Sequence, residues 1–435
     1  MSINQLTKPI SVFRNKNLFI GGNDTVELVN KYGTPLYVID ELTLREVCKE
    51  YKNSFKSLSQ VRLTYASKAL STLATSKIIA DEGFGFDVVS AGELKTLYHA
   101  GIDMSTVTFN GNNKTESEIE YALDLGIGRF SVDNFNEAKL LNDIALKKNC
   151  IAKILLRVTP GIECHTHEYI MTGQIDSKFG FDLSQLESAV SLILSDYNNL
   201  SIMGLHAHIG SQIFEKQCYK DELLILTREL KFLNNKFNLS LNELNIGGGL
   251  GVKYTDSDEP PSISEFADVI SETLDSLECK DLILYIEPGR SLVSTAGVTL
   301  YRIGSSKTVP QCRKYIAIDG GMADNPRPSM YKAKYIAEIC NDTTGREDEL
   351  VTIAGRFCES GDILIENINL PSPMSGDILC VYNTGAYNYS MASNYNKVAK
   401  PAMVLVNNSQ SDIIVNRESL DDLISLERIP DRLKK

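Results

Sequence analysis

Lys68 has more distinctive chemistry than most residues in the sequence. It follows the β-rich run Arg62–Ala66, with Tyr65 three residues before it. Most lysines are solvated surface residues, and Lys68 could be one of them. At the end of a buried strand, however, desolvation would favour the neutral, nucleophilic amine. Lys68 is therefore a candidate for Schiff-base chemistry.

Two glycine-containing loops could hold the charged parts of a ligand. Gly247-Gly-Gly249 follows a short β run, and backbone N–H groups in such a loop can cradle a phosphate. A tight structural loop is an equally good interpretation, and the spacing matches neither a dinucleotide fingerprint nor a Walker loop. Glu287-Pro-Gly-Arg290 ends another β run. Glu287 could be the structural ion-pair partner of Arg290, or it could hold a protonated ring nitrogen, since a nearby anion raises the pKa of that nitrogen.

The histidines favour a stacking role over a metal site. His206-Ala-His208 places two imidazoles on one face of a strand, and His165-Thr-His167 has the same spacing. The chain has 5 histidines and none after residue 208, whereas a metal-dependent barrel hydrolase usually needs more of them at later strand ends. We therefore expect no metal, and a flat ring beside a planar ligand suits a strand-end histidine better.

Cys358 and Tyr387 have no independent claim to function. Cys358 lies in the segment Gly355–Asp362, after a β run. Most cysteines are small buried hydrophobes, and composition alone favours that interpretation here. Tyr387 lies in the loop Thr384–Tyr389. Neither residue would be selected without a comparison to other sequences.

Eight short β-rich runs position most of the candidate residues. They alternate with amphipathic helical stretches, which implies right-handed parallel crossovers. Eight such units over roughly 250 residues match a (β/α)8 barrel, with an open doubly wound sheet as the alternative. Polar residues collect after the C-terminal ends of the runs, where barrel enzymes build their sites, and this favours an enzyme. The runs are Arg62–Ala66, Phe86–Val89, Val107–Phe109, Arg129–Val132, Lys153–Val158, Ile202–Ile209, Glu243–Ile246 and Leu282–Ile286.

From about Ser291 the pattern becomes all-β, with short runs separated by Gly, Pro, Asn and Asp instead of long helices. We expect a barrel over residues 35–290 and a sandwich-like or barrel-like β-domain made of residues 1–34 and 291–435. The stretch Leu18–Ile20 would add a strand to that β-domain. Its other runs are Lys314–Ile318, Tyr335–Ile339, Leu350–Ala354, Ile363–Ile365, Ile378–Tyr382, Ala402–Val406 and Asp412–Val415.

Composition narrows the possible partners and the compartment. The net charge of −12 disfavours nucleic acid and anionic membranes, because both require a concentrated basic surface. The 9 scattered cysteines are typical of reduced thiols. The polar stretch 1–16 is unlike a signal peptide, and no apolar run approaches the ~18–20 residues of a membrane helix. We expect a cytoplasmic protein with a small-molecule substrate.

Taken together, five motifs resemble those of the fold-type III pyridoxal-phosphate (PLP) decarboxylases. This group includes the diaminopimelate, ornithine and arginine decarboxylases, with alanine racemase more distantly related. The resemblance extends from about Tyr32 to Pro430 and implies a PLP-binding barrel with a C-terminal β-domain. The motifs are Tyr65-Ala-Ser-Lys68, Phe86-Asp-Val-Val-Ser-Ala-Gly-Glu93, His206-Ala-His-Ile-Gly-Ser211, Gly247-Gly-Gly249 and Glu287-Pro-Gly-Arg290.

The C-terminal motifs are similar to those of the diaminopimelate decarboxylase subgroup. They are Asp319-Gly-Gly-Met322, Arg327-Pro-Ser-Met-Tyr331 and Cys358-Glu-Ser-Gly-Asp362, while Ala323–Pro326 departs from the usual linker. The resemblance implies conversion of meso-2,6-diaminopimelate to L-lysine and CO2, the last step of lysine biosynthesis. An ornithine, arginine or carboxynorspermidine decarboxylase is the alternative enzyme. A non-catalytic PLP-binding relative is the alternative outside enzymes.

The resemblance also implies a role for each site residue. Lys68 binds PLP covalently, Glu287 pairs with the ring nitrogen, and His208 stacks on the ring. Cys358 is the proton donor, and Glu359 receives the distal ammonium of the substrate. Asp87 and Arg157 are added because they stand at strand ends. The remaining cofactor contacts are Asp87, Ser211, Gly247, Gly248, Gly249, Pro288, Gly289, Arg290 and Tyr387. The remaining substrate contacts are Arg157, Arg290, Arg327, Tyr331 and Tyr387.

The same resemblance implies a homodimer. In this family the segment around Cys358 and Glu359 would reach the barrel of the other subunit, so that two chains share each active site.

Overall fold

The computed structural model describes residues 2–58, 60–162, 177–279 and 281–434. The chain divides into two compact units. The first contains Met1–Leu6 and Arg45–Val293, and the second contains Thr7–Leu44 and Ser294–Lys435.

These units differ from the expected boundaries at residues 35 and 291 in two places. Strand β4 (Leu36–Asp40) belongs to the second unit because it pairs with two strands there. The N-terminal residues belong to the first unit, where the Asn4 side-chain amide donates to the carbonyls of Gly251 (3.0 Å) and Pro261 (2.9 Å). Both placements depend on long-range hydrogen bonds that local sequence does not indicate.

The first unit is a closed barrel of eight parallel strands. The strand order is β9-β11-β12-β13-β5-β6-β7-β8, and pairing of β8 with β9 closes it, so the open-sheet alternative is wrong. Strands β7 and β12 have no exposed residue, although β12 contains the polar residues Glu243 and Asn245. All eight predicted runs form these strands: β5 (Val61–Ala66), β6 (Gly85–Val88), β7 (Val107–Phe109), β8 (Arg129–Val132), β9 (Ala152–Thr159), β11 (Leu200–His206), β12 (Glu243–Asn245) and β13 (Ile283–Ile286).

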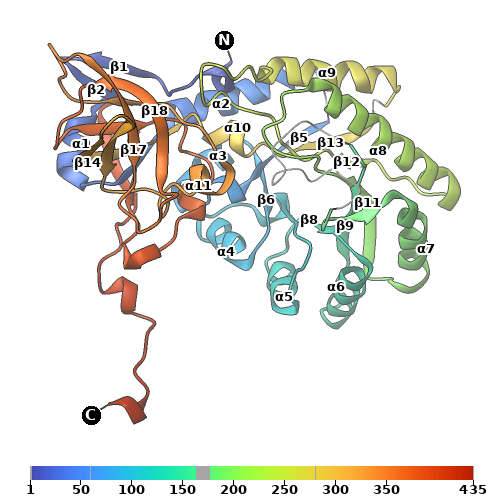
Figure 1. Cartoon of the computed structure of the whole chain (residues 1–435). Helices are drawn as coiled ribbons and strands as arrows, with labels where there is room; N and C mark the ends of the chain where they lie inside the picture. The colour runs from blue at the N-terminus through green and yellow to red at the C-terminus, as the bar shows by residue number, and fades with distance from the viewer. Residues whose placement is uncertain (1, 59, 163–176, 280, 435) are drawn as a thin grey trace. The chain divides into compact units, whose positions relative to one another are not determined.

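Helices lie outside the strands of this barrel (Figure 1), and polar caps fix where several of them begin. Thr115 and Glu118 form a capping box at the start of α5, and Ser262 forms the same motif with Glu265 at α9. Ser90 accepts from the Glu93 N–H at the start of α4. The helices are α2 (Glu41–Ser54), α3 (Leu73–Asp81), α4 (Ala91–His99), α5 (Glu116–Asp124), α6 (Phe135–Lys147), α7 (Leu186–Asp196), α8 (Lys216–Phe237), α9 (Ile263–Ser276) and α10 (Arg290–Val293).

The second unit is mostly sheet. Its largest sheet has nine strands and is centred on β14 (Gly297–Val309), which pairs with β4, β15 and β19. The predicted runs all form strands, but β14 was not among them, because its second half is exposed and polar. The predicted Leu18–Ile20 strand lies in a separate three-stranded sheet. The elements are β1 (Ser11–Arg14), β2 (Asn17–Ile20), β3 (Asn23–Asp24), α1 (Thr25–Tyr32), β15 (Arg313–Ile318), α11 (Arg327–Tyr331), β16 (Ala337–Ile339), β17 (Asp348–Ala354), β18 (Ile363–Pro371), β19 (Ile378–Val381), β20 (Ala402–Asn407) and β21 (Gln410–Val415).

Candidate active site

Lys68 follows strand β5 directly, in the short 3-10 turn Ser67–Ala69. Two hydrogen bonds fix this turn: the Tyr65 hydroxyl donates to the Leu70 carbonyl (2.9 Å), and the Ala66 N–H donates to the Pro288 carbonyl (3.1 Å). The side chain of Lys68 is exposed, while its neighbours in the turn are buried. The backbone of Lys68 is therefore fixed at the C-terminal end of the barrel strands, while its side chain is exposed, so the expected burial of the amine is wrong.

Glu287 is a buried carboxylate held in one orientation. The Asn245 amide donates to its Oε1 atom (2.6 Å), and His206 Nε2 lies 3.6 Å from its Oε2 atom. Burial alone would raise the pKa of Glu287, but His206, the Asn245 hydrogen bond and the Lys68 charge outweigh burial and hold that pKa below its usual value. Glu287 is therefore ionised and suited to hold a protonated ring nitrogen.

Asp87 behaves in the opposite way. Burial raises the pKa of Asp87 well above its usual value, and the nearby charge of Glu287 adds to that rise. The Asn110 amide donates to Asp87. Two carboxyl groups in one site thus have pKa values that are moved apart, which is typical of catalytic centres.

His208 is neutral in this environment. Burial, followed by the charges of Lys68 and Arg157, holds the pKa of His208 well below its usual value. Its Nδ1 atom accepts from the Gly248 N–H (3.3 Å), which orients the ring. An uncharged, oriented imidazole fits the predicted stacking role.

The Gly247–Gly249 loop approaches its neighbours too closely for any side chain. A Cβ on Gly248 would lie 2.0 Å from the Glu287 carbonyl oxygen, and one on Gly247 would lie 2.6 Å from His208 Nδ1. Gly247 and Gly249 also have φ values of +60° and +106°, which glycine adopts most readily. The loop therefore leaves open backbone beside Glu287 and His208.

Arg290 and Ser211 form a polar pair at the start of α10. The guanidinium donates to the Ser211 hydroxyl from Nε (3.2 Å) and Nη2 (3.0 Å), and to the Tyr254 hydroxyl (2.9 Å). Because the Ser211 oxygen accepts from Arg290, its own proton points elsewhere and can be donated to an anion. The glycine loop and this pair together fit a phosphate group.

Arg157 is buried within the barrel unit. Its Nε lies 3.9 Å from Asp133 Oδ1, its guanidinium lies 4.3 Å from the centre of the Phe179 ring, and burial lowers its pKa. These contacts hold the guanidinium in place at the end of β9. The predicted substrate contact of Arg157 stays a prediction.

A buried network supports these residues, and most of its members have no signal in the sequence because their partners are distant along the chain. The Ser131 hydroxyl lies 2.6 Å from His206 Nδ1, which leaves Nε2 of that ring facing Glu287. The Lys114 ammonium donates to the carbonyl of Ser131 (2.7 Å) and to Glu137 (2.6 Å). His206 therefore supports Glu287, and the described residues contain no group of three or more His, Cys, Asp and Glu arranged for a metal.

The predicted residues of the second unit lie in three of its segments. Arg327 is buried at the start of α11 and donates to the Tyr335 hydroxyl (2.6 Å), with Tyr331 half-buried at the end of this helix. Cys358 and Glu359 are exposed, and the Tyr395 hydroxyl donates to Glu359. Tyr387 lies in a separate segment, between β19 and β20.

Tyr387 has φ +61°, which is rare for a bulky residue. Strained backbone of this kind collects at functional sites, where the surrounding structure enforces it. This feature gives Tyr387 the independent support that its sequence context lacked.

A barrel with an anchored lysine, an ionised carboxylate and a neutral imidazole at the same strand ends defines a pyridoxal-dependent enzyme. The sequence profile "Pyridoxal-dependent decarboxylase, pyridoxal binding domain" matches residues 43–294. The barrel and its site therefore belong to the pyridoxal-dependent decarboxylases.

Full-length relatives narrow the family further. The chain is 47% identical to the diaminopimelate decarboxylase of Synechocystis sp., over 99% of this chain and 95% of that relative. It is 44% identical to the enzyme of the same name from Bacillus subtilis, over 94% and 95% of the two chains. The crystal structure of the M. jannaschii diaminopimelate decarboxylase in complex with L-lysine matches with a TM-score of 0.93 at 33% identity, over 100% of both chains. The chain belongs to the diaminopimelate decarboxylase family.

No helix in the described ranges is both long and apolar enough to cross a bilayer.

Proposed function

We propose that this chain removes CO2 from meso-diaminopimelate to give L-lysine, with PLP as cofactor. The observation that carries the proposal is the arrangement of Lys68, the ionised Glu287 and the neutral His208 at one end of the barrel. Membership of the diaminopimelate decarboxylase family and the L-lysine bound to the M. jannaschii relative support the choice of substrate.

The barrel residues fit PLP by their chemistry. When bound, PLP supplies the electron sink that decarboxylation of an amino acid requires. Lys68 would hold it through the ε-amine, and His208 would lie beside its ring. Glu287 would accept a hydrogen bond from the ring nitrogen and keep that nitrogen protonated, because the carboxylate is ionised and held by Asn245.

The phosphate lies against the glycine loop and the polar pair in this proposal. Ser211 donates its hydroxyl proton to a phosphate oxygen while its own oxygen stays on Arg290. The Gly247–Gly249 loop allows close approach because no side chain covers it. Gly289 also has little room for a side chain, since a Cβ there would lie 3.1 Å from the Ala66 Cβ.

The proposed substrate contacts include residues of the second unit and Arg157 of the first. A guanidinium reads a carboxylate well, and the bond to Tyr335 fixes the direction of Arg327. Arg157, Tyr331 and Tyr387 are proposed to contribute further substrate contacts, with Glu359 receiving the distal ammonium. Cys358 Sγ is the proposed donor of the proton that replaces CO2 at the substrate Cα.

We further propose a homodimer with shared active sites, in which Cys358 and Glu359 serve the barrel of a second chain. The exposure of both side chains is compatible with this proposal. Mixing a Lys68→Ala chain with a Cys358→Ala chain tests it, because mixed dimers should regain up to one working site. No recovery after confirmed mixing would overturn sharing.

A cytoplasmic location is part of the same proposal. The 8 cysteines in the described ranges are free thiols, as expected of a protein kept in a reducing compartment.

A substrate panel tests the reaction directly. Purified protein is given meso-diaminopimelate, ornithine, arginine or carboxynorspermidine, and CO2 release is measured, with Lys68→Ala as the inactive control. We expect release from meso-diaminopimelate with L-lysine as product. Preference for another substrate would overturn the assignment but not the cofactor, and no release from any of them would favour a non-catalytic PLP-binding relative.

A further inference from the structure

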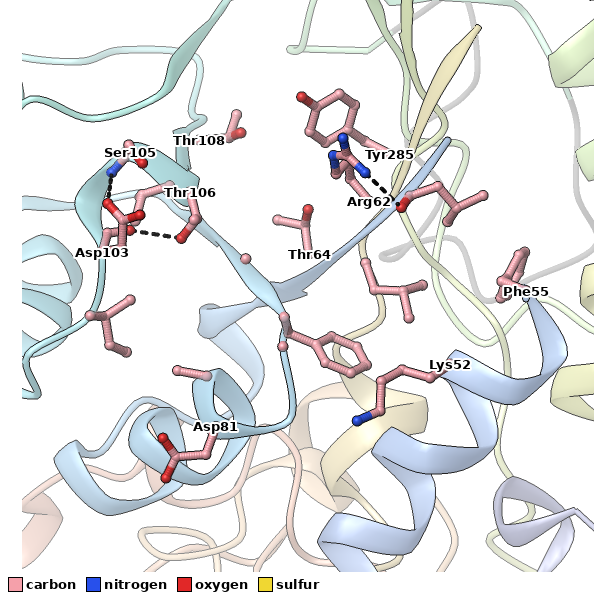
Figure 2. A pocket seen from close by; sticks show the side chains of 18 of the residues that line it. Lys52, Phe55, Arg62, Thr64, Asp81, Asp103, Ser105, Thr106, Thr108 and Tyr285 are labelled. Atoms are coloured by element: carbon pink, nitrogen blue, oxygen red, sulfur yellow. Dashed lines mark hydrogen bonds between the residues drawn. The ribbon is translucent and has the colours of Figure 1, made fainter. Parts of the chain in front are cut away.

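The barrel unit has a second cavity, at the end opposite to Lys68. It lies at the N-terminal ends of strands β5, β6 and β7, beside the end of α2 (Figure 2), and its volume is about 810 Å³. Cavities of about 300–1,000 Å³ are typical of small-molecule sites. The proposed reaction does not use this cavity.

Two threonine side chains line the cavity. Thr64 on β5 and Thr108 on β7 are only 2% and 3% exposed. Their hydroxyls make no hydrogen bond with any residue in the described ranges, and Figure 2 shows both side chains at the cavity. Both hydroxyls open onto the cavity, where they can donate a hydrogen bond to a polar ligand or to water.

Arg62 adds a cation on the same wall. It lies two residues before Thr64 on β5, so both side chains leave the same face of the strand. Its neighbour in the adjacent strand is Tyr285, and Figure 2 shows the guanidinium beside that ring. In the described residues the guanidinium makes only a 3.5 Å bond to the Val61 carbonyl and has no carboxylate partner.

The other cations of the lining are mostly neutralised. Arg129 donates to Glu243 with two bonds of 2.5 Å, and Lys52 donates to Glu82 at 2.9 Å. Lys77 pairs with Asp81. The carboxylate of Asp103 also lines the cavity, where it accepts from the Ser105 N–H.

Lys56 is a second lining cation that has no ion-pair partner in the described part of the chain. Arg62 and Lys56 are two unpaired cations in the described lining, against one unpaired anion, Asp103. The wall beside the two hydroxyls therefore carries a net positive charge. A guanidinium fork with hydroxyl donors is chemistry that selects oxyanions. We propose that this cavity is a binding site for a small oxyanion, a carboxylate or a phosphate, held by Arg62, Thr64 and Thr108.

Calorimetric titration of the holoenzyme at constant ionic strength tests the site. Separate titrations use inorganic phosphate and succinate, which distinguish the two sources of the oxyanion. We expect saturable binding of at least one, weakened about tenfold or more in Arg62→Gln, because that side chain supplies the charged hydrogen bonds. The isosteric double variant Thr64→Val/Thr108→Val should also weaken anion binding. It replaces Arg62→Gln as the test if Arg62→Gln fails to fold.

Lys95→Gln is the matched control, since it removes one charge from an exposed lysine of helix α4. Its binding should equal that of the unmodified protein. Crystals soaked in selenate should show an anomalous peak beside Arg62. Binding that is unchanged in Arg62→Gln and in the threonine pair, or no saturable binding of either anion, would overturn the proposal.

Discussion

The Asn245→Ala variant provides a quantitative test of how the protein keeps Glu287 ionised. Asn245 donates to Glu287 Oε1 at 2.6 Å, deep inside the barrel. The substitution removes this donor but leaves His206 at its 3.6 Å distance from Oε2. Glu287 then loses one of the partners that favour its charged form, and its pKa rises.

The size of the rise follows from the strength of the lost bond. A hydrogen bond to a charged group contributes about 1.5–3 kcal/mol. One pKa unit corresponds to about 1.4 kcal/mol, so the pKa of Glu287 should rise by about 1–2 units. Since the ionised carboxylate is the working form, the acid limb of the pH–activity profile should move to higher pH by the same amount.

The assay is the pH dependence of kcat/KM for CO2 release from meso-diaminopimelate. Asn242→Ala is the matched control, because it makes the same change at an exposed asparagine just before β12. The midpoint of the acid limb is compared, since Asn245 also accepts from the Gly247 N–H (2.8 Å) and its loss will reduce overall activity. An acid limb at the same pH in both variants would refute the reasoning about Glu287.

Three further predictions concern other parts of the chain. Burial raises the pKa of Asp324 to about 7, so the folded state binds more protons than the unfolded state, and the free energy of unfolding falls by up to about 4 kcal/mol as pH rises from about 4 to 7. Urea unfolding of Asp324→Asn should lack this fall, and the same dependence of the unfolding free energy on pH in the variant would contradict the prediction. Gly248→Ala places a Cβ 2.0 Å from the Glu287 carbonyl and should weaken cofactor binding or stability by about 1–3 kcal/mol. Cofactor titration and thermal unfolding measure these two effects, and wild-type values for both would show that the loop adjusts. Tyr335→Phe removes the acceptor that directs Arg327 and should raise KM for diaminopimelate about tenfold or more with a smaller effect on kcat, whereas an unchanged KM would argue against a substrate role for Arg327.

The barrel could be predicted from the sequence because its signal is local. Alternation of short apolar runs with amphipathic helices is visible along the chain, and each predicted run is a strand. The first boundary was misplaced because the role of β4 depends on pairing with β14 and β20, far away in the sequence. Strand β14 was missed because its exposed polar half has no apolar pattern.

The strand-end residues of the candidate site could be predicted from the sequence, but the residues that support them could not. Lys68, His208 and Glu287 stand at strand ends, and the structure brings them within electrostatic reach of one another. The supporting residues were not predictable, because their partners are distant in sequence. Ser131 and His206 are 75 residues apart, and only the closed barrel brings their side chains together.

Reduction with borohydride followed by peptide mass mapping identifies the lysine that carries the cofactor. Borohydride fixes the linkage between pyridoxal phosphate and the amine that carries it, and the mass of each peptide then locates the modified residue. We expect one modified peptide, the one that contains Lys68, and no modification in Lys68→Ala. Modification of a different lysine, or of none after loading with pyridoxal phosphate, would contradict the account.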